Sequence, residues 1–550
     1  MTRNGNSPDQ LADWTVMVFL AGDNNLSAEC VFALTEMKRA SLNGRVNVIA
    51  QFDPQDEHIP SRRFRISNNP APGRLILDNL GRAPFQESAR VNFRALKRAE
   101  ALAEGEKAII NAAGGGALGP SLKAEILGNG NGNGNGNGVA EGETDTGAPV
   151  TIYSFMSFCV ERFKAKHYMV VLSGHGGGTE PDFLMKDESP FGSLTIPELK
   201  QAFADIQADL DPSQRIDILG FDSCLMSMAE VCYELKGLVD IVIGSEGYSP
   251  ASGWPYREIL ERLSREVDDT TLGLETPDYA ASIRKRIAKG IVDEYVNFYA
   301  DYWLGGVSVA QAALDVDKVK ELKIHIDNLA DALIGELDKP EARAAMILAH
   351  WDAQSYHGEL FIDLADFCNC LKERYENDVI SGLCETLTTF IASEFVLKSC
   401  HSGPAYQYSY GVSVYFPWSR VTPSYGELEF SQQSSWAKFL NAYTEKTRRL
   451  PRGIEPGPKL DQFKASLASE RVRMTFDLGP PGNPIYSMRN PPLIAEPGDC
   501  IRARKSILQG MLQGRAGLPE SEVTPQSVKQ QAGEQKQVKQ QVKTPQTLEQ

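Results

Sequence analysis

Residues 215–226 read RIDILGFDSCLM and contain the change from strand to helix that decides the fold. The run 215–221 is short and apolar, as expected for a buried strand, whereas residues 225–232 place apolar side chains at helical spacing. Cys224 is therefore predicted to lie at a helix N-terminus, where unpaired backbone N–H groups and the helix dipole favour a thiolate. The stretch predicts a reactive cysteine at the carboxyl end of a strand.

A second strand end carries a histidine. Residues 168–178 read YMVVLSGHGGG, an apolar run that ends in a glycine-rich loop containing His175. The sequence TIPE at 195–198 then predicts a helix start, with a capping box and a proline in the first turn. Strands and helices alternate in this part of the chain, which predicts a parallel sheet covered on both faces. Because ligands gather at the carboxyl ends of such strands, His175 and Cys224 are predicted to form a Cys/His dyad.

Composition and spacing divide the chain into several parts. The GNGNGN repeat cannot bury enough apolar surface to offset its ordering entropy, and the Gln- and Lys-rich end contains no aromatic residues. The predicted organisation is a flexible leader at 1–13, a catalytic domain at 14–300 with a Gly/Asn-rich insertion near 111–148, a C-terminal part at 301–450 that completes or packs on this domain, a loop-rich extension at 451–514, and a disordered tail at 515–550.

Charge and cysteine content restrict the partners. The 550-residue chain has a formal charge of −16 and a pI near 5.1, which argues against nucleic acid as a partner. No apolar stretch resembles a signal sequence or a membrane span, so no membrane partner is expected and a cytoplasmic location is predicted. Nine scattered cysteines do not resemble a disulfide framework, and the seven histidines lack zinc-ligand spacing, so no metal site is assigned.

Three motifs together resemble the clostripain family of cysteine peptidases, which are relatives of the caspases, gingipains and legumains. They are WTVMVFLAGDNNL at 14–26, SGHGGG at 173–178 and FDSCLM at 221–226. Cys224 follows His175 by 49 positions, close to the interval of about 50 residues in caspases. The resemblance implies a caspase-like three-layer α/β/α sandwich with a mostly parallel sheet, followed by a helix-rich C-terminal part and the disordered tail.

The resemblance also implies roles for individual residues. His175 and Cys224 would be the catalytic dyad, and the backbone N–H groups of Gly176 and Cys224 would bind the oxyanion. Asp222 would lie in the pocket for the residue before the scissile bond and select arginine or lysine. The alternative for Asp222 is a helix N-cap.

Three more residues are candidates by resemblance. Glu246 and Trp254 match the family's pocket-wall loop, although residues 247–249 replace a stretch that is usually more acidic. Glu246 would either add negative charge to the pocket or be a solvated loop residue. Lys186, expected in a polar loop, matches the region where relatives cleave themselves after a basic residue, and its alternative is an ordinary surface lysine.

The sequence therefore predicts a cysteine endopeptidase acting on proteins or peptides with Arg or Lys before the scissile bond. Relatives include calcium-dependent enzymes, but no EF-hand or compact acidic run is visible here, and no cofactor is assigned. Two alternatives remain open. One is a catalytically silent caspase-like interaction module, and the other is a thiol hydrolase of non-peptide amides.

Overall fold

The computed structural model describes ten stretches of the chain. These are residues 11–55, 59–67, 76–82, 144–181, 183–188, 191–269, 277–300, 307–357, 360–418 and 420–448. Most of the predicted leader, the Gly/Asn repeat, the extension at 451–514 and the tail at 515–550 lie outside the described residues.

A nine-stranded sheet runs through the described structure. Its central strands are parallel, because β2, β1, β5, β8 and β9 follow one another in the same direction, whereas the strands on both sides of them pair antiparallel. Across the sheet the order is β13 (Val396–Ser402), β10 (Val309–Asp315), β9 (Val239–Gly244), β8 (Ile216–Asp222), β5 (Ala165–Ser173), β1 (Ala12–Gly22), β2 (Val46–Pro54), β3 (Arg62–Ser67) and β4 (Ile76–Arg82).

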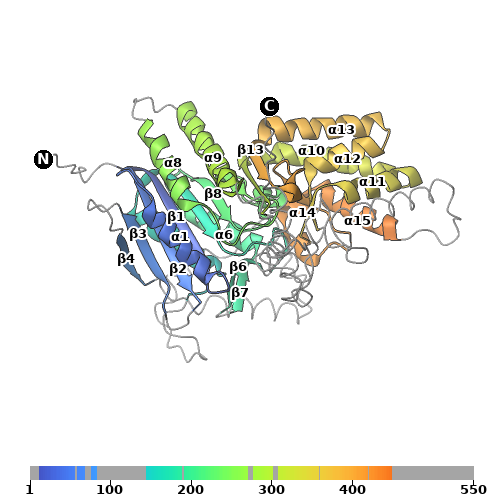
Figure 1. The fold of residues 1–550 in the computed structure, drawn as a ribbon. Helices are drawn as coiled ribbons and strands as arrows, with labels where there is room; N and C mark the ends of the chain where they lie inside the picture. Colours follow the sequence, from blue (N-terminus) through green and yellow to red (C-terminus); the bar gives the residue numbers. More distant parts are fainter. Residues whose placement is uncertain are drawn as a thin grey trace, which may run out of the picture.

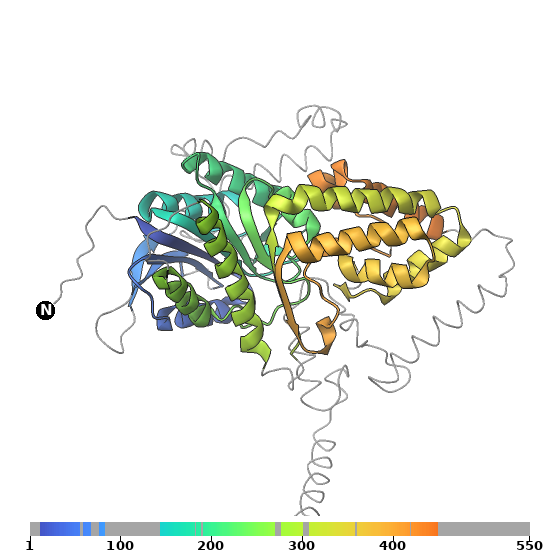
Figure 2. The same ribbon diagram turned by 90° about the horizontal axis from the view of Figure 1, so that it is seen from above.

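Helices cover both faces of this sheet, as Figures 1 and 2 show. One apolar core lies beneath α1 (Ser27–Arg39), α8 (Tyr256–Asp269) and α9 (Pro277–Ala300). The other lies beneath α5 (Pro149–Arg162), α6 (Ile196–Asp209) and α7 (Ala229–Glu234). Strand side chains alternate between the two cores, which is why the strand sequences are apolar throughout. The predicted three-layer α/β/α sandwich with a mostly parallel sheet is confirmed.

The part after residue 300 both completes the sheet and adds helices. Strands β10 and β13 extend the sheet beyond β9, and the C-terminal helices pack into the core that contains α6. These helices are α10 (Val319–Glu336), α11 (Pro340–Asp352), α12 (Leu364–Arg374), α13 (Asp378–Phe390), α14 (Glu429–Gln433) and α15 (Ser435–Arg448). The predicted helix-rich C-terminal part is therefore present and shares the catalytic sheet.

Two small sheets lie near the carboxyl edge of the central strands. One is the hairpin of β6 (Leu184–Glu188) and β7 (Phe191–Leu194). The other joins β11 (Ser355–Tyr356), β12 (Phe361–Asp363) and β14 (Ser413–Tyr415) in antiparallel pairs. The apolar run at 411–417 thus contributes to this small sheet and does not extend the large one.

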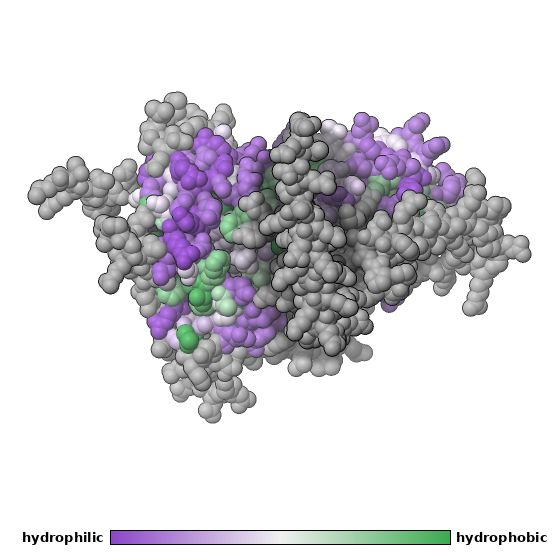
Figure 3. All heavy atoms as spheres, in the orientation of Figure 1, coloured by the Kyte–Doolittle hydropathy of each residue, from purple (hydrophilic) through white to green (hydrophobic). Residues whose placement is uncertain are grey.

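The described surface is mostly hydrophilic on the face shown in Figure 3, with an apolar patch over α1. Val31 and Phe32 on α1 are among the exposed large apolar side chains. In the part of the chain that the structure describes, no helix combines the length and the apolar composition needed to cross a membrane.

Candidate active site

The register of two parallel strands brings the histidine and the cysteine to one edge of the sheet. Ser173 at the end of β5 pairs with Asp222 at the end of β8, so the two loops that follow leave the sheet side by side. A Cβ atom on Gly176 would lie only 2.4 Å from the backbone oxygen of Cys224. The loop carrying His175 therefore packs directly on the loop carrying Cys224.

Cys224 does not lie at a helix N-terminus, and this prediction was wrong. Helix α7 begins five residues later, at Ala229, and is only six residues long. Leu225 adopts a left-handed conformation, with φ of 66°, which prevents a helix from starting there. The following residues turn toward the small sheet, where the Ser413 N–H donates to the Ser227 oxygen over 2.9 Å. Tertiary hydrogen bonds have replaced the expected first helical turn.

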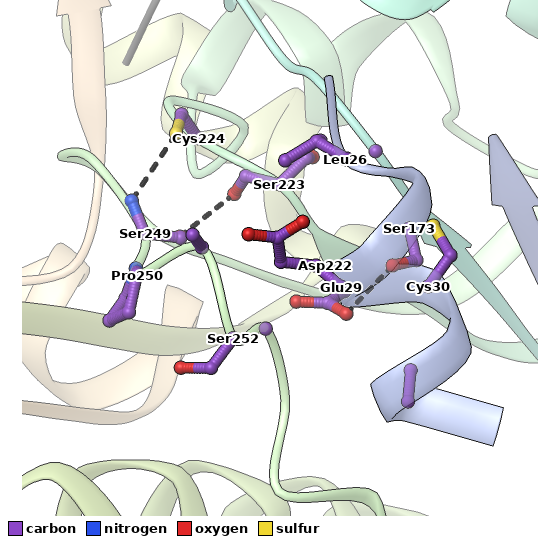
Figure 4. A pocket seen from close by; sticks show the side chains of 14 residues that line it. Leu26, Glu29, Cys30, Ser173, Asp222, Ser223, Cys224, Ser249, Pro250 and Ser252 are labelled. Carbon is purple, nitrogen blue, oxygen red and sulfur yellow. Dashed lines mark hydrogen bonds between the residues drawn. The ribbon is translucent and has the colours of Figure 1, made fainter. Parts of the chain in front are cut away.

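The thiol of Cys224 is held by a neighbouring loop. Its side chain is buried, and its Sγ atom accepts a hydrogen bond from the backbone N–H of Ser249 at 3.3 Å. The Ser249 hydroxyl donates to the backbone oxygen of Ser223, and the Leu225 N–H donates to the Gly247 oxygen over 3.0 Å. A backbone N–H donor stabilises a thiolate, so Ser249 takes part of the role that we had assigned to a helix dipole. Figure 4 shows the contacts of Ser249 with Cys224 and Ser223.

His175 has a side-chain partner that the sequence did not reveal. The Nε2 atom of this buried imidazole lies 2.8 Å from Oδ1 of Asn25. Asn25 belongs to the turn after β1, which is the strand paired with β5. A hydrogen bond from Nε2–H to Asn25 fixes the orientation of the imidazole ring, so the Nδ1 atom points away from Asn25. The only sequence signal was the run Asp-Asn-Asn at 23–25, which follows a strand as the other two loops do.

A narrow slot opens beside Cys224 (Figure 4). It encloses about 30 Å³, which is space for about two water molecules. Its walls come from α1, from the ends of β5 and β8, and from the turn before α8. The lining residues are Leu26, Glu29, Cys30, Ala33, Ser173, Gly174, Asp222, Ser223, Cys224, Ser249, Pro250, Ala251, Ser252 and Gly253.

Asp222 is a buried carboxylate in this slot. Its Oδ2 atom accepts hydrogen bonds from the hydroxyls of Ser173, at 2.9 Å, and Tyr256, at 2.8 Å. Its Oδ1 atom is buried and accepts no hydrogen bond from the described residues. Burial raises the pKa of Asp222, and the two hydroxyls together with the backbone N–H of Trp254 only partly offset this. The alternative of a helix N-cap does not hold, because the residue before α7 is Met228.

Trp254 packs on β8 and is not among the residues that line the slot. The indole is buried over β8, where a Cβ atom on Gly220 would lie 2.4 Å from its Cη2 atom. Its backbone N–H lowers the pKa of Asp222, as described above. The predicted role of Trp254 in substrate binding therefore has no support from the lining of the slot and stays a prediction.

Glu246 is neither a solvated loop residue nor part of the slot. It is 1% exposed, and its Oε2 atom accepts a hydrogen bond from the Gly411 N–H at 2.8 Å. Burial raises its pKa well above the ordinary range, and the charge and hydrogen bond of Asp363 raise it further. Burial also raises the pKa of Asp363 to about 7. The pair joins the loop behind Cys224 to the small sheet.

Lys186 lies in a strand, not in a polar loop. It is half-buried in β6, and its backbone oxygen accepts a hydrogen bond from Asn24 at 2.7 Å. The next residue, Asp187, is fully buried and accepts hydrogen bonds from the N–H and hydroxyl of Thr146. The peptide bond after Lys186 is therefore held in ordered structure.

Metal binding was tested on the side chains that could supply ligands. Within the described ranges, no three His, Cys, Asp or Glu side chains are arranged to hold a metal ion. No residue is assigned to calcium, and no chemical step below uses a metal.

Comparison with known proteins gives the same family as the motifs. The clostripain family model matches residues 18–448. Clostripain of Hathewaya histolytica is 24% identical over 268 residues, which are 41% of this chain and 48% of that protein. The chain thus spans about half the length of this curated relative.

Two solved structures are also similar. A secreted C11 cysteine protease from Bacteroides thetaiotaomicron, in complex with an irreversible peptide inhibitor, has 15% identity and a TM-score of 0.49, with 78% of this chain and 99% of that one covered. An inactive zymogen C11 protease from Parabacteroides distasonis has 17% identity and a TM-score of 0.48, with 77% and 98% covered. The predicted cytoplasmic location of this chain stays a prediction.

Proposed function

The chain belongs to the clostripain family of cysteine peptidases, and from this premise we propose that it is an endopeptidase that cleaves peptide bonds after arginine or lysine. The observation that carries the proposal is the carboxylate of Asp222, which lies buried in a slot beside Cys224 with one oxygen lacking a hydrogen-bond partner. An ionised carboxylate buried without a cation is unfavourable, and a substrate guanidinium or ammonium would relieve this cost.

In the proposed mechanism, Cys224 and His175 divide the chemistry. The Cys224 thiolate attacks the carbonyl carbon, and the electron pair of the carbonyl bond moves to oxygen, where the N–H groups of Gly176 and Cys224 stabilise it. The C–N bond then breaks as protonated His175 gives its proton to the leaving amine. Water then gives a proton to His175 and attacks the thioester carbonyl, and cleavage of the C–S bond releases the acid and restores the Cys224 thiolate beside protonated His175.

The slot must widen to accept a long side chain, since it now holds only about two water molecules. The turn at 250–253 is one part of the wall that lies outside the strands and helices. It is attached to α9 through the Tyr299 hydroxyl, which contacts Ser252 and donates to the Gly253 oxygen. We expect this turn to move outward when substrate binds.

Peptide hydrolysis with defined variants tests the function. Four fluorogenic peptides that differ only in Arg, Lys, Asp or Asn before the fluorophore are incubated with wild type, Cys224→Ala and His175→Ala. Wild type is expected to hydrolyse the Arg and Lys peptides, and both variants to lose this activity. Hydrolysis of none of the peptides would refute the peptidase and favour a silent module, whereas hydrolysis confined to Asp or Asn would refute the role of Asp222.

Self-activation by cleavage after Lys186 is part of the same proposal. Because this bond lies in β6, the hairpin of β6 and β7 has to open before the bond can enter the active site. Purified wild type is expected to give two fragments of about one third and two thirds of the mass. Cys224→Ala and Lys186→Gln should remain intact. A wild type that stays in one piece while hydrolysing peptides would show that self-cleavage is not needed.

A further inference from the structure

The slot beside Cys224 contains a second acidic side chain. Glu29 lies in the first turn of α1 and lines the slot together with Leu26, Cys30 and Ala33 of the same region. Asp222 comes from a different element, the end of β8. Figure 4 shows both side chains at the slot. The two carboxylates therefore reach one cavity from elements that are far apart in the sequence.

Cys30, which also lines the slot, lies close enough to both carboxylates to sense their charge. Burial raises the pKa of the Cys30 thiol, and the charges of Asp222 and then Glu29 raise it further. No basic residue is among the described residues that line the slot. Asp222 is 6% exposed, and its Oδ1 atom has no hydrogen-bond partner among the described residues. A positively charged group from outside is the ligand that this arrangement fits.

We propose that Glu29 is a second specificity-determining carboxylate of the slot and makes it prefer arginine over lysine, an inference that rests on the proposed pocket for a basic side chain. A guanidinium is planar and presents five N–H donors on more than one edge. It can donate to Asp222 at the base of the slot and to Glu29 on the α1 side at once. An ammonium is a compact charge that depends on one carboxylate for most of its binding.

A purely structural role for Glu29 gives a different expectation. A carboxylate in the first turn of a helix stabilises that helix by interacting with the positive end of its dipole. Loss of this interaction would lower the stability of α1 and affect all substrates equally. Only a direct role in the slot changes the ratio between arginine and lysine substrates, so that ratio is the quantity to measure.

The test compares Glu29→Gln with Glu36→Gln. Glutamine keeps the size of each side chain, and Glu36 lies two turns further along α1, outside the slot, in an ion pair with Arg39. The substrates are peptides identical except for arginine, lysine or citrulline, the uncharged arginine analogue, before the scissile bond. We expect Glu29→Gln to lower kcat/KM about tenfold for the arginine peptide and about twofold for the lysine peptide, as fits loss of one charge-assisted hydrogen bond. Glu36→Gln should leave both within about twofold of wild type.

Each outcome has one interpretation. If wild type hydrolyses neither the arginine nor the lysine peptide, the proposed function fails before Glu29 is tested. If wild type hydrolyses both and Glu29→Gln leaves their ratio unchanged, the proposed function stands and the inference about Glu29 is wrong. A fall in the ratio that Glu36→Gln does not share supports the inference. Wild type that treats citrulline like arginine would overturn it as well, because the charge would then not be recognised.

Discussion

Replacing Asn25 should slow the reaction by removing the group that orients His175. The bond between His175 Nε2 and Asn25 Oδ1 measures 2.8 Å, a normal hydrogen-bond length. A neutral hydrogen bond contributes about 1 kcal/mol, and one to a charged group about 1.5–3 kcal/mol. The proposed mechanism uses a protonated imidazole, which favours the larger value, but Asn25 is exposed and water replaces part of its contribution. We therefore expect Asn25→Ala to cost about 1.5–2 kcal/mol, or about 10- to 30-fold in kcat/KM.

Asn25→Asp is the matched variant, because an aspartate can only accept hydrogen bonds and keeps an oxygen in the same place. It should recover kcat/KM to within about threefold of wild type. The assay is initial-rate hydrolysis of an arginine peptide, with the rate of Cys224 alkylation by iodoacetamide as a second measure of thiolate formation. Two results would refute the reasoning. One is wild-type activity in Asn25→Ala, and the other is equal loss in the alanine and aspartate variants.

Three further predictions concern the slot, the oxyanion loop and the buried acid pair. Asp222→Asn should lower kcat/KM for basic peptides about 100-fold. Burial raises the pKa of Asp222, so the kcat/KM of wild type on these peptides should fall as the pH drops through that raised pKa. The pH–rate profile of the variant should lack this fall. Gly176→Ala should abolish hydrolysis and lower the melting temperature, since its Cβ atom would lie 2.4 Å from the Cys224 backbone oxygen and force the loop to move. An active alanine variant with the wild-type melting temperature would contradict the packing. The pKa values of Glu246 and Asp363 are raised in the folded protein, so the folded state binds protons more tightly than the unfolded chain. The folded protein is therefore expected to lose stability as the pH rises through about 7. Thermal melts between pH 5.5 and 8 should show this loss in wild type and a smaller loss in Glu246→Gln.

The burial of Glu246 explains how the C-terminal part supports the site. The Glu246 carboxylate binds the Gly411 N–H, and the Tyr406 hydroxyl accepts a hydrogen bond from the Tyr248 N–H at 2.9 Å. Both contacts act on the loop at 245–249, whose Ser249 N–H reaches the Cys224 thiol. The part after residue 300 therefore holds the loop behind Cys224, in addition to completing the sheet.

Local sequence patterns were enough to predict the central strands and helices of the sandwich. They also predicted that the loops carrying His175 and Cys224 lie side by side. Apolar runs indicated the strands at the centre of the sheet, and TIPE at 195–198 correctly predicted the start of α6, where the capping box of Thr195 and Glu198 is present. Parallel strands that follow one another end at the same edge, so the juxtaposition of the His175 and Cys224 loops follows from periodicity alone.

Local patterns failed where the chain is held by distant residues. Apolar residues at helical spacing after Cys224 predicted a helix, but Leu225 is left-handed and its neighbours bind residues near 411–413. A leucine carries no local signal for that conformation, because the surrounding contacts impose it.

The sequence by itself therefore determined the layered sheet and the edge at which Cys224 and His175 lie, because strand periodicity and the order of the elements are local properties. Only the tertiary structure decided which groups surround them. Asn25 beside His175, Ser249 beside Cys224 and Glu29 in the slot all come from segments remote in sequence. Contacts of this kind depend on how complete elements pack, and no spacing within one element can encode them.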